Sequence, residues 1–222
     1  IMTSTAYRQQ SGGDQETARL DPNLRLLSRF PLRRLDAEAL RDSVLKLSGR
    51  LDLTPYGPAD EIKTTPNGEV VAKLNPKGYR RSIYLMQRRS IPVTMLEAFD
   101  APLLVPNCLK RPHSTVSSQA LQLENSELVR ISAQYMAGRI IDSVGNDLKK
   151  QIERVYLLTL ARPPSSQEVC KAEEILRQLT QEWLRHFDFQ VPVEPINSKA
   201  QWMALASLCH TYLNSAEFLY LN

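Results

Sequence analysis

Residues 125–141, with the sequence N-S-E-L-V-R-I-S-A-Q-Y-M-A-G-R-I-I, decide the fold class of this chain of 222 residues. Asn125 is a helix-capping residue type, and the apolar side chains after it recur mostly at spacings of three and four, at Leu128, Ala133, Met136, Ala137 and Ile140. Asn146 is expected to cap a second helix, in which Ile152 and Val155 face inward. Two amphipathic helices in succession predict a mainly α-helical fold.

Further helices are expected on both sides of this pair. Asp36 is expected to cap a helix that ends at Gly49, because glycine readily takes the left-handed conformation found at helix ends. Ser165 and Glu168 form the S-x-x-E capping box of the longest helix. A last amphipathic helix is predicted from 198 to 213. Near the beginning of the chain, Asp21 followed by a proline predicts a short helix to about residue 29.

A β/loop insertion at about 54–90 interrupts the helices. Its centre is Pro66-Asn67-Gly68, a strong turn signal, and Ile62–Thr64 and Val70–Ala72 are expected to pair across it. Arg81–Met86 alternates apolar and polar residues and is predicted to be a third extended piece. We therefore expect an irregular multi-helix domain with a small antiparallel β element near residues 61–86, in which residues 1–222 form one helix-rich domain.

The composition excludes several classes of protein. Apolar residues make up 42% of the chain, too many for a disordered protein, and the net charge is only +4. This small excess argues against a dedicated nucleic-acid binder. No apolar run approaches the ~20 residues that span a bilayer, so no membrane span is expected. The chain begins at Ile1, and we interpret it as a fragment of a larger protein.

The sequence offers weak candidates for a catalytic site. The segment 97–119 combines Asp100, Cys108 and His113, and a Cys–His pair can form a thiolate nucleophile. An enzyme with an unrecognised active site on this loop is one hypothesis. In the alternative, Arg111 pairs with Asp100 or Glu97 and pins the loop. Three cysteines without C-x-x-C spacing, and three dispersed histidines, predict no metal site and no cofactor within this chain.

The residues proposed for binding are mostly basic or polar. Five basic residues and no acid lie between Lys77 and Arg89, which suggests a binder of anionic polymer, and nearby tyrosines could stack on sugars or bases. The candidate binding residues of the chain are Arg80, Arg81, Tyr84, Arg88, Arg111 and Gln119. In the alternative, the arginines are salt-bridged anchors to Glu38, Asp42 or Glu61.

Several short strings, in a fixed order, carry a resemblance to a known family. They are R-R-S-I-Y at 80–84, F-D-A-P at 99–102, the stretch from Cys108 to Leu121, and L-N-S-A-E-F-L-Y at 213–220, supported by R-L-D-A-E at 34–38 and A-R-P-P at 161–164. With these strings the chain resembles the planctomycete domain of unknown function fifteen fifty-three over nearly its whole length.

The resemblance implies a setting but no activity. Such domains look like C-terminal parts of large exported proteins, often behind a cytochrome-c-like domain, and this chain lacks the family's N-terminal part. It implies an exported or periplasmic location, with neighbouring domains of the parent protein, a glycan or another protein as partners. We therefore interpret the chain as a non-catalytic binding or assembly module of an exported multidomain protein.

Overall fold

A computed structural model describes residues 1–222 except 10, 13–14, 103–110, 112–113, 187–195 and 222. The helices in the described part are α1 (Gln15–Leu20), α2 (Ala37–Ser48), α3 (Thr94–Ala98), α4 (Ser117–Asn125), α5 (Glu127–Val144), α6 (Leu148–Thr159), α7 (Ser166–His186), α8 (Ile196–Leu213), α9 (Ala216–Leu219) and the 3-10 turn η1 (Ser82–Tyr84). The strands are β1 (Arg33–Arg34), β2 (Leu51–Asp52), β3 (Ile62–Thr64), β4 (Val70–Ala72), β5 (Tyr79–Arg80) and β6 (Tyr220–Leu221). The predicted mainly α fold with a small β element is confirmed.

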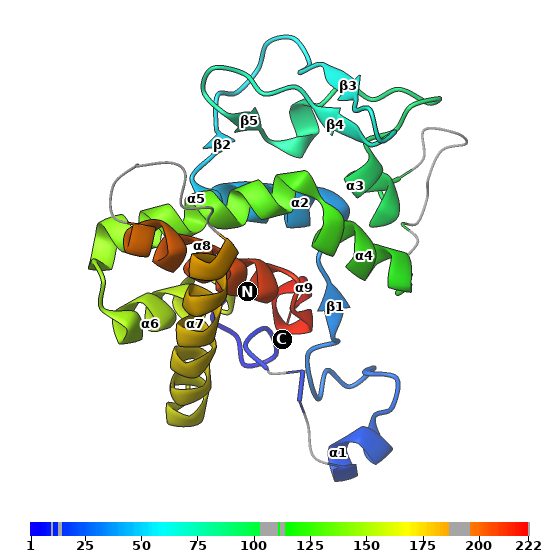
Figure 1. Ribbon diagram of the computed structural model, residues 1–222. Coiled ribbons are helices and arrows are strands. Elements are labelled where there is room, and N and C mark those ends of the chain that lie inside the picture. Colours follow the sequence, from blue (N-terminus) through cyan, green and yellow to red (C-terminus); the bar gives the residue numbers. More distant parts are fainter. Residues whose placement is uncertain (10, 13–14, 103–110, 112–113, 187–195, 222) are drawn as a thin grey trace.

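Helix α5 lies at the centre of the molecule (Figure 1). Helix α2 packs against it on one side and α8 on another, while α6 and α7 complete the helical body. The residues that meet in this core are fully buried; they include Leu40, Val44, Met136, Ile140 and Leu205. Burial of aliphatic side chains from both halves of the chain is the main term that stabilises this arrangement.

Helix α8 packs against both α5 and α7, so protein covers more than one of its faces. Its exposed positions are polar and include Lys199, Gln201 and Thr211. Ala200, Ala204 and Cys209 on this helix have no exposed surface. No helix in the described part of the chain is long and apolar enough to cross a membrane.

The predicted hairpin around residues 66–68 is confirmed. Strands β3 and β4 pair antiparallel with Ile62 opposite Ala72, and Gly68 has the positive φ of 86° that the turn demands. The prediction of a third extended piece at Arg81–Met86 is wrong. The chain forms the short strand β5, which pairs in parallel with β2, and then turns into η1. The cause is Asp42, whose carboxylate accepts the Ser82 N–H and hydroxyl and bends the backbone there.

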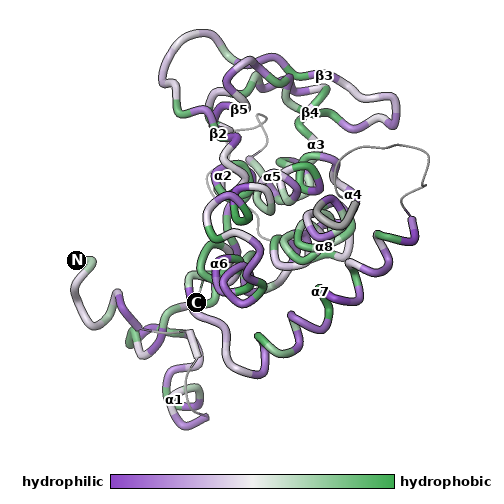
Figure 2. The backbone as a smooth tube through the Cα atoms, turned by 60° about the vertical axis from the view of Figure 1, so that its left-hand side comes forward, coloured by the Kyte–Doolittle hydropathy of each residue, from purple (hydrophilic) through white to green (hydrophobic). Residues whose placement is uncertain are grey.

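The predicted helix after Asp21 is also wrong. Helix α1 ends just before this residue, and the Asp21 carboxylate instead accepts the N–H groups of Arg25 and Leu26 at 2.8 and 2.9 Å. These bonds hold a compact loop in place of a helix. Figure 2 shows this N-terminal segment standing apart from the helical body. Its leucines Leu20, Leu26 and Leu27 are largely exposed.

The predicted starts of α2, α5, α6 and α7 were accurate to within about a residue. The cap of α2 is Asp36, and Gly49 ends this helix with φ of 77°. Helices α5 and α6 are capped by Ser126 and Asp147, each one residue after the predicted asparagine. The capping box of α7 is formed, because the Ser165 N–H donates to Glu168 and the Glu168 N–H to Ser165.

Candidate functional site

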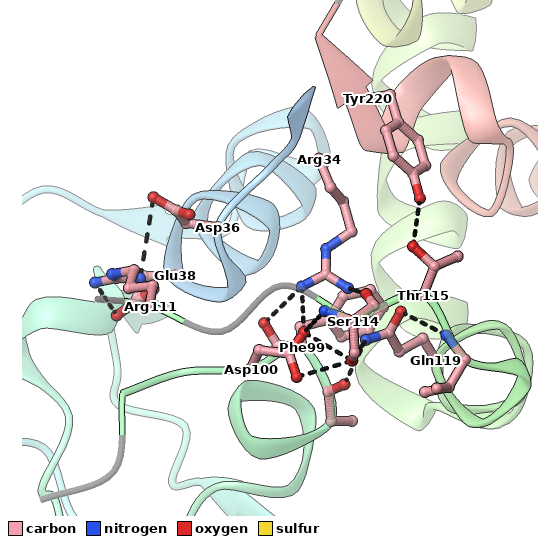
Figure 3. A network of polar contacts seen from close by, with 12 residues as sticks. Arg34, Asp36, Glu38, Phe99, Asp100, Arg111, Ser114, Thr115, Gln119 and Tyr220 are labelled. Carbon is pink, nitrogen blue, oxygen red and sulfur yellow. Dashed lines mark hydrogen bonds and ion pairs between the residues drawn. The ribbon is translucent and has the colours of Figure 1, made fainter. Parts of the chain in front are cut away.

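A buried ion pair between Arg34 and Asp100 lies beside the β1–β6 strand pair (Figure 3). Arg34 Nη2 donates to Asp100 Oδ2 at 2.9 Å and to the Phe99 carbonyl at 3.0 Å, while Nη1 donates to the Ser114 carbonyl at 2.6 Å. The guanidinium also lies over the Phe99 ring, with its carbon 5.3 Å from the ring centroid. Only 5% of the Arg34 side chain is exposed, so this charge is compensated by protein groups and not by solvent.

Ser114 and Gln119 complete this network. The Ser114 N–H and hydroxyl both donate to the Asp100 carboxylate, at 2.7 and 2.9 Å. Gln119 Nε2 donates to the Ala98 carbonyl and to Ser114 Oγ, and Thr115 is hydrogen-bonded to the Tyr220 hydroxyl. The network therefore joins β1, the end of α3, the start of α4 and β6 at one place (Figure 3).

Asp100 is held in the ionised form by these contacts. Burial raises the pKa of its carboxyl, but the hydrogen bonds from Ser114 and Arg34 outweigh burial and lower the pKa below its ordinary value. Its backbone has a φ of 62°, which a short polar residue tolerates better than most. A carboxylate with these donors is poorly suited to accept a proton near neutral pH, and its geometry is that of an anchor.

Arg80 is an anchor of a different loop. Its guanidinium donates to the carbonyl oxygens of Thr54, Tyr56 and Pro58 and to the Asp60 carboxylate. It also lies over the Tyr84 ring, 4.1 Å from the centroid. Because its side chain is almost fully buried and its donors are used, Arg80 holds the 54–60 loop and is not placed to meet a ligand on the surface.

Arg81 points the other way from Arg80 and is exposed. Its Nε lies 3.3 Å from the Asp42 carboxylate on α2, and that carboxylate also accepts the Ser82 N–H at 2.7 Å. Arg111 forms a two-pronged ion pair with Glu38, with distances of 2.7 and 3.0 Å. The Arg111 hydrogen bond lowers the pKa of the Glu38 carboxyl, although partial burial opposes this effect. Arg111 therefore pairs with α2, not with Asp100 or Glu97.

These two ion pairs line one open cleft of about 840 Å³. Its wall is α2, which contributes Glu38, Asp42 and Lys46, and its opposite side carries Leu53 and Ile83. Leu53 is 70% exposed and Ile83 is 76% exposed. The cleft thus combines apolar side chains in contact with solvent and charged pairs beside them, and we refer to it below as the outer cleft.

Of the remaining sequence-predicted site residues, Cys108 and His113 lie outside the described residues. Arg88 is exposed, and its Nε contacts the sulfur of Met86 at 3.3 Å. Cys170 is exposed and Cys209 is buried, and both are free. Among the described residues, no group of three His, Cys, Asp or Glu side chains is placed to hold a metal ion.

Arg34, Ser114 and Asp60 take part in these networks but were not among the sequence-predicted site residues. Arg34 and Asp100 are 66 positions apart, so no local pattern could pair them. One sequence signal could have pointed to Arg34, because it is the first residue of the R-L-D-A-E string that supports the family resemblance. Arg34, Asp100 and Tyr220, from three of the family-like strings, therefore lie in one network that anchors a loop and the C-terminal tail.

The comparisons with known proteins agree with the resemblance seen in the sequence. A family model described as PSD1, protein of unknown function (DUF1553), matches residues 1–176. The match covers most of the chain and ends within α7, so the L-N-S-A-E-F-L-Y string at 213–220 lies beyond it. No curated protein and no solved structure matches the chain. The chain belongs to the PSD1 family of proteins of unknown function (DUF1553).

Proposed function

We propose that this chain is a binding and assembly module of an exported multidomain protein, and that the outer cleft receives a polypeptide segment of a neighbouring domain. The observation that carries the proposal is the exposure of Leu53 and Ile83 beside the charged pairs of α2. Exposed apolar side chains with a polar rim are typical of protein–protein contact sites.

The charges of the outer cleft favour a polypeptide over a polyanion. Three acids, Asp36, Glu38 and Asp42, line the same cleft as three basic residues, Lys46, Arg81 and Arg111. The cleft therefore has no net charge, and a polyanion would meet three carboxylates there. A polypeptide that offers one or two apolar side chains between charges of both signs matches this pattern.

The identity of the partner rests on the family resemblance. It points to neighbouring domains of the same parent protein, among them a cytochrome-c-like domain, and to an exported or periplasmic setting. A module of this kind would position such a domain and supply no cofactor of its own.

Replacement of the apolar centre of the outer cleft tests this proposal. Ile83→Glu places a charge at the centre of the cleft, whereas Ile175→Glu alters an exposed isoleucine on α7, far from it in sequence and on another helix. Binding to the separately produced neighbouring domains of the parent protein is measured by calorimetry. We expect Ile83→Glu to weaken binding by at least about tenfold, or 1.4 kcal/mol, and Ile175→Glu to leave it unchanged. Equal affinities of the two variants would contradict the proposal.

A further inference from the structure

A second, more enclosed pocket of about 210 Å³ lies between the β3–β4 hairpin and the first turn of α5. It is separate from the outer cleft, and Figure 1 shows the hairpin lying above the helical layer at this point. Its apolar wall includes Val70, Ala72, Met95 and Leu128. An apolar cavity of about 150 Å³ is large enough to bind benzene, so this space can hold a benzene-sized body with a small polar group.

Two buried polar atoms of this pocket, Arg41 Nη2 and Ser126 Oγ, have no hydrogen-bond partner. Arg41 lines the pocket with a side chain that is 2% exposed, and its Nη2 atom is unpartnered, although its Nη1 donates to the Arg80 carbonyl and to Ser82 Oγ. Ser126, which also lines the pocket and is 2% exposed, has an unpartnered hydroxyl. A buried donor without an acceptor is costly, so this pair calls for an acceptor.

The start of α5 also favours a hydrogen-bond acceptor in this pocket. Ser126 occupies the cap position of this 18-residue helix, yet its side chain accepts no hydrogen bond from the first turn. The first N–H groups of a helix carry partial positive charge and favour an anion near them. Arg41, Ser126 and the start of α5 therefore all favour a negatively charged hydrogen-bond acceptor in this pocket.

The other charges of the pocket limit the charge of its ligand. Arg50, which lies over the rings of Tyr79 and Tyr135 at 5.2 and 4.4 Å, and Lys63 also line it. Glu69 and Glu127 line it too, and Glu69 accepts a hydrogen bond from Gln122. The three cationic side chains and two carboxylates of the lining are joined by Asp42, whose carboxylate lies 3.6 Å from Arg41 Nη1. With three charges of each sign the pocket has no excess positive charge to balance a phosphate dianion, so a monoanion held by hydrogen bonds fits it better.

We propose that this pocket binds a small monocarboxylate with an apolar body. Its carboxylate accepts hydrogen bonds from Arg41 Nη2 and from the Ser126 hydroxyl, and its body lies against the apolar wall formed by β4 and α5. The inference is independent of the outer cleft and of the partner proposed for it.

Benzoate is the probe for the wild-type protein. Calorimetry and thermal unfolding of the full chain are measured with benzoate, with benzamide as its neutral isostere, and with inorganic phosphate. We expect saturable benzoate binding that raises the unfolding temperature, and benzamide binding that is weaker by at least about tenfold. The proposal is overturned by the lack of saturable benzoate binding up to about 10 mM, or by phosphate binding as tightly as benzoate.

Three variants locate the site. Arg41→Lys keeps the charge but removes the Nη2 donor. Arg139→Lys is its matched control, because Arg139 on α5 also donates to backbone carbonyls, those of Lys46 and Leu47 at the end of α2, and does not line the pocket. Benzoate binding should weaken by about tenfold in the first variant and stay unchanged in the second. Ser126→Asp adds a carboxylate at the cap of α5, and we expect it to fold and to lose benzoate binding. If Arg41→Lys does not fold, Ser126→Asp decides. Wild-type affinity in every folded variant would refute the site.

Discussion

Buried arginines hold this protein together by donating to backbone carbonyl oxygens. Arg34 reaches the carbonyls of Phe99 and Ser114, and Arg80 reaches three carbonyls of the 54–60 loop. Guanidinium groups suit this task because they offer five donors in a fixed plane and stay charged at any relevant pH. The presence of Arg34 and Arg80 in the family-like strings is therefore explained by loop anchoring.

Asp100→Asn tests the central anchor. The variant keeps the shape of the side chain and tolerates the positive φ, but it leaves the Arg34 charge buried without its counter-ion. We expect the free energy of unfolding in urea to fall by about 3 kcal/mol. Arg177→Gln is a suitable control, because it removes an exposed helical ion pair worth only about 0.5 kcal/mol. A loss as small as that of the control would mean that the network does not anchor the fold.

At the scale of elements, short sequence patterns predicted the elements whose contacts lie between neighbouring residues. They failed where a residue far away in the sequence determines the local conformation. The hairpin and the capping box of α7 were predictable, because the residues that form them are neighbours in sequence. The 3-10 turn η1 was not, because Asp42 on α2 supplies the acceptor that bends residues 82–84. In the same way, no pattern near Arg33 reveals that β1 pairs with β6 almost two hundred residues later.

The strand pair β2–β5 depends on a glycine. Gly78 has a φ of 120°, and an added Cβ would lie 2.4 Å from the carbonyl oxygen of Arg50, which is too close for any rearrangement of a side chain to relieve. Gly68 has a φ of 86° but open space around it, so it is the matched control. We expect Gly68→Ala to cost about 1 kcal/mol and Gly78→Ala at least twice as much, measured by urea unfolding. Equal costs would show that the β2–β5 pair can shift to make room.

We expect the ion pair at the start of α7 to make the free energy of unfolding depend on pH in the acid range. Arg162 donates two hydrogen bonds to Glu168 and two to Glu217, and the Arg162 hydrogen bonds are the largest cause that lowers the pKa of Glu168 to about 2. Because the folded-state pKa is below the ordinary glutamate value of 4.5, the stabilisation is complete above pH 4.5 and is lost as the pH falls toward 2.

Glu168→Gln is the test of this pH dependence. The difference in unfolding free energy between wild type and variant should be constant above pH 4.5 and shrink below it. Urea unfolding followed by circular dichroism at several pH values measures it. A difference that does not change with pH would show that Glu168 stabilises α7 only as a hydrogen-bonding group and not through its charge.

At the scale of the whole molecule, the N-terminal segment and the C-terminal tail differ in how they join the body. The core begins at α2, and among residues 1–32 in the described part of the chain only Asp21 is buried. The C-terminal tail is short but well tied. It buries Phe218, pairs β6 with β1, bonds Tyr220 to Thr115 and places Glu217 against Arg162. Composition does not separate the two segments, because apolar residues are frequent both in the tail and in residues 20–32.

Two truncations test this asymmetry. A chain that starts at Pro31 should unfold within about 2 °C of the full chain, because it loses little buried apolar surface. A chain that ends at Ser215 should unfold about 10 °C lower, since it loses a buried phenylalanine, worth about 3–5 kcal/mol, and strand β6. Calorimetric scans of the full chain and of the two truncated chains measure the three unfolding temperatures. A larger loss from the N-terminal truncation would mean that the exposed leucines of residues 20–32 contribute to the stability of the core in solution.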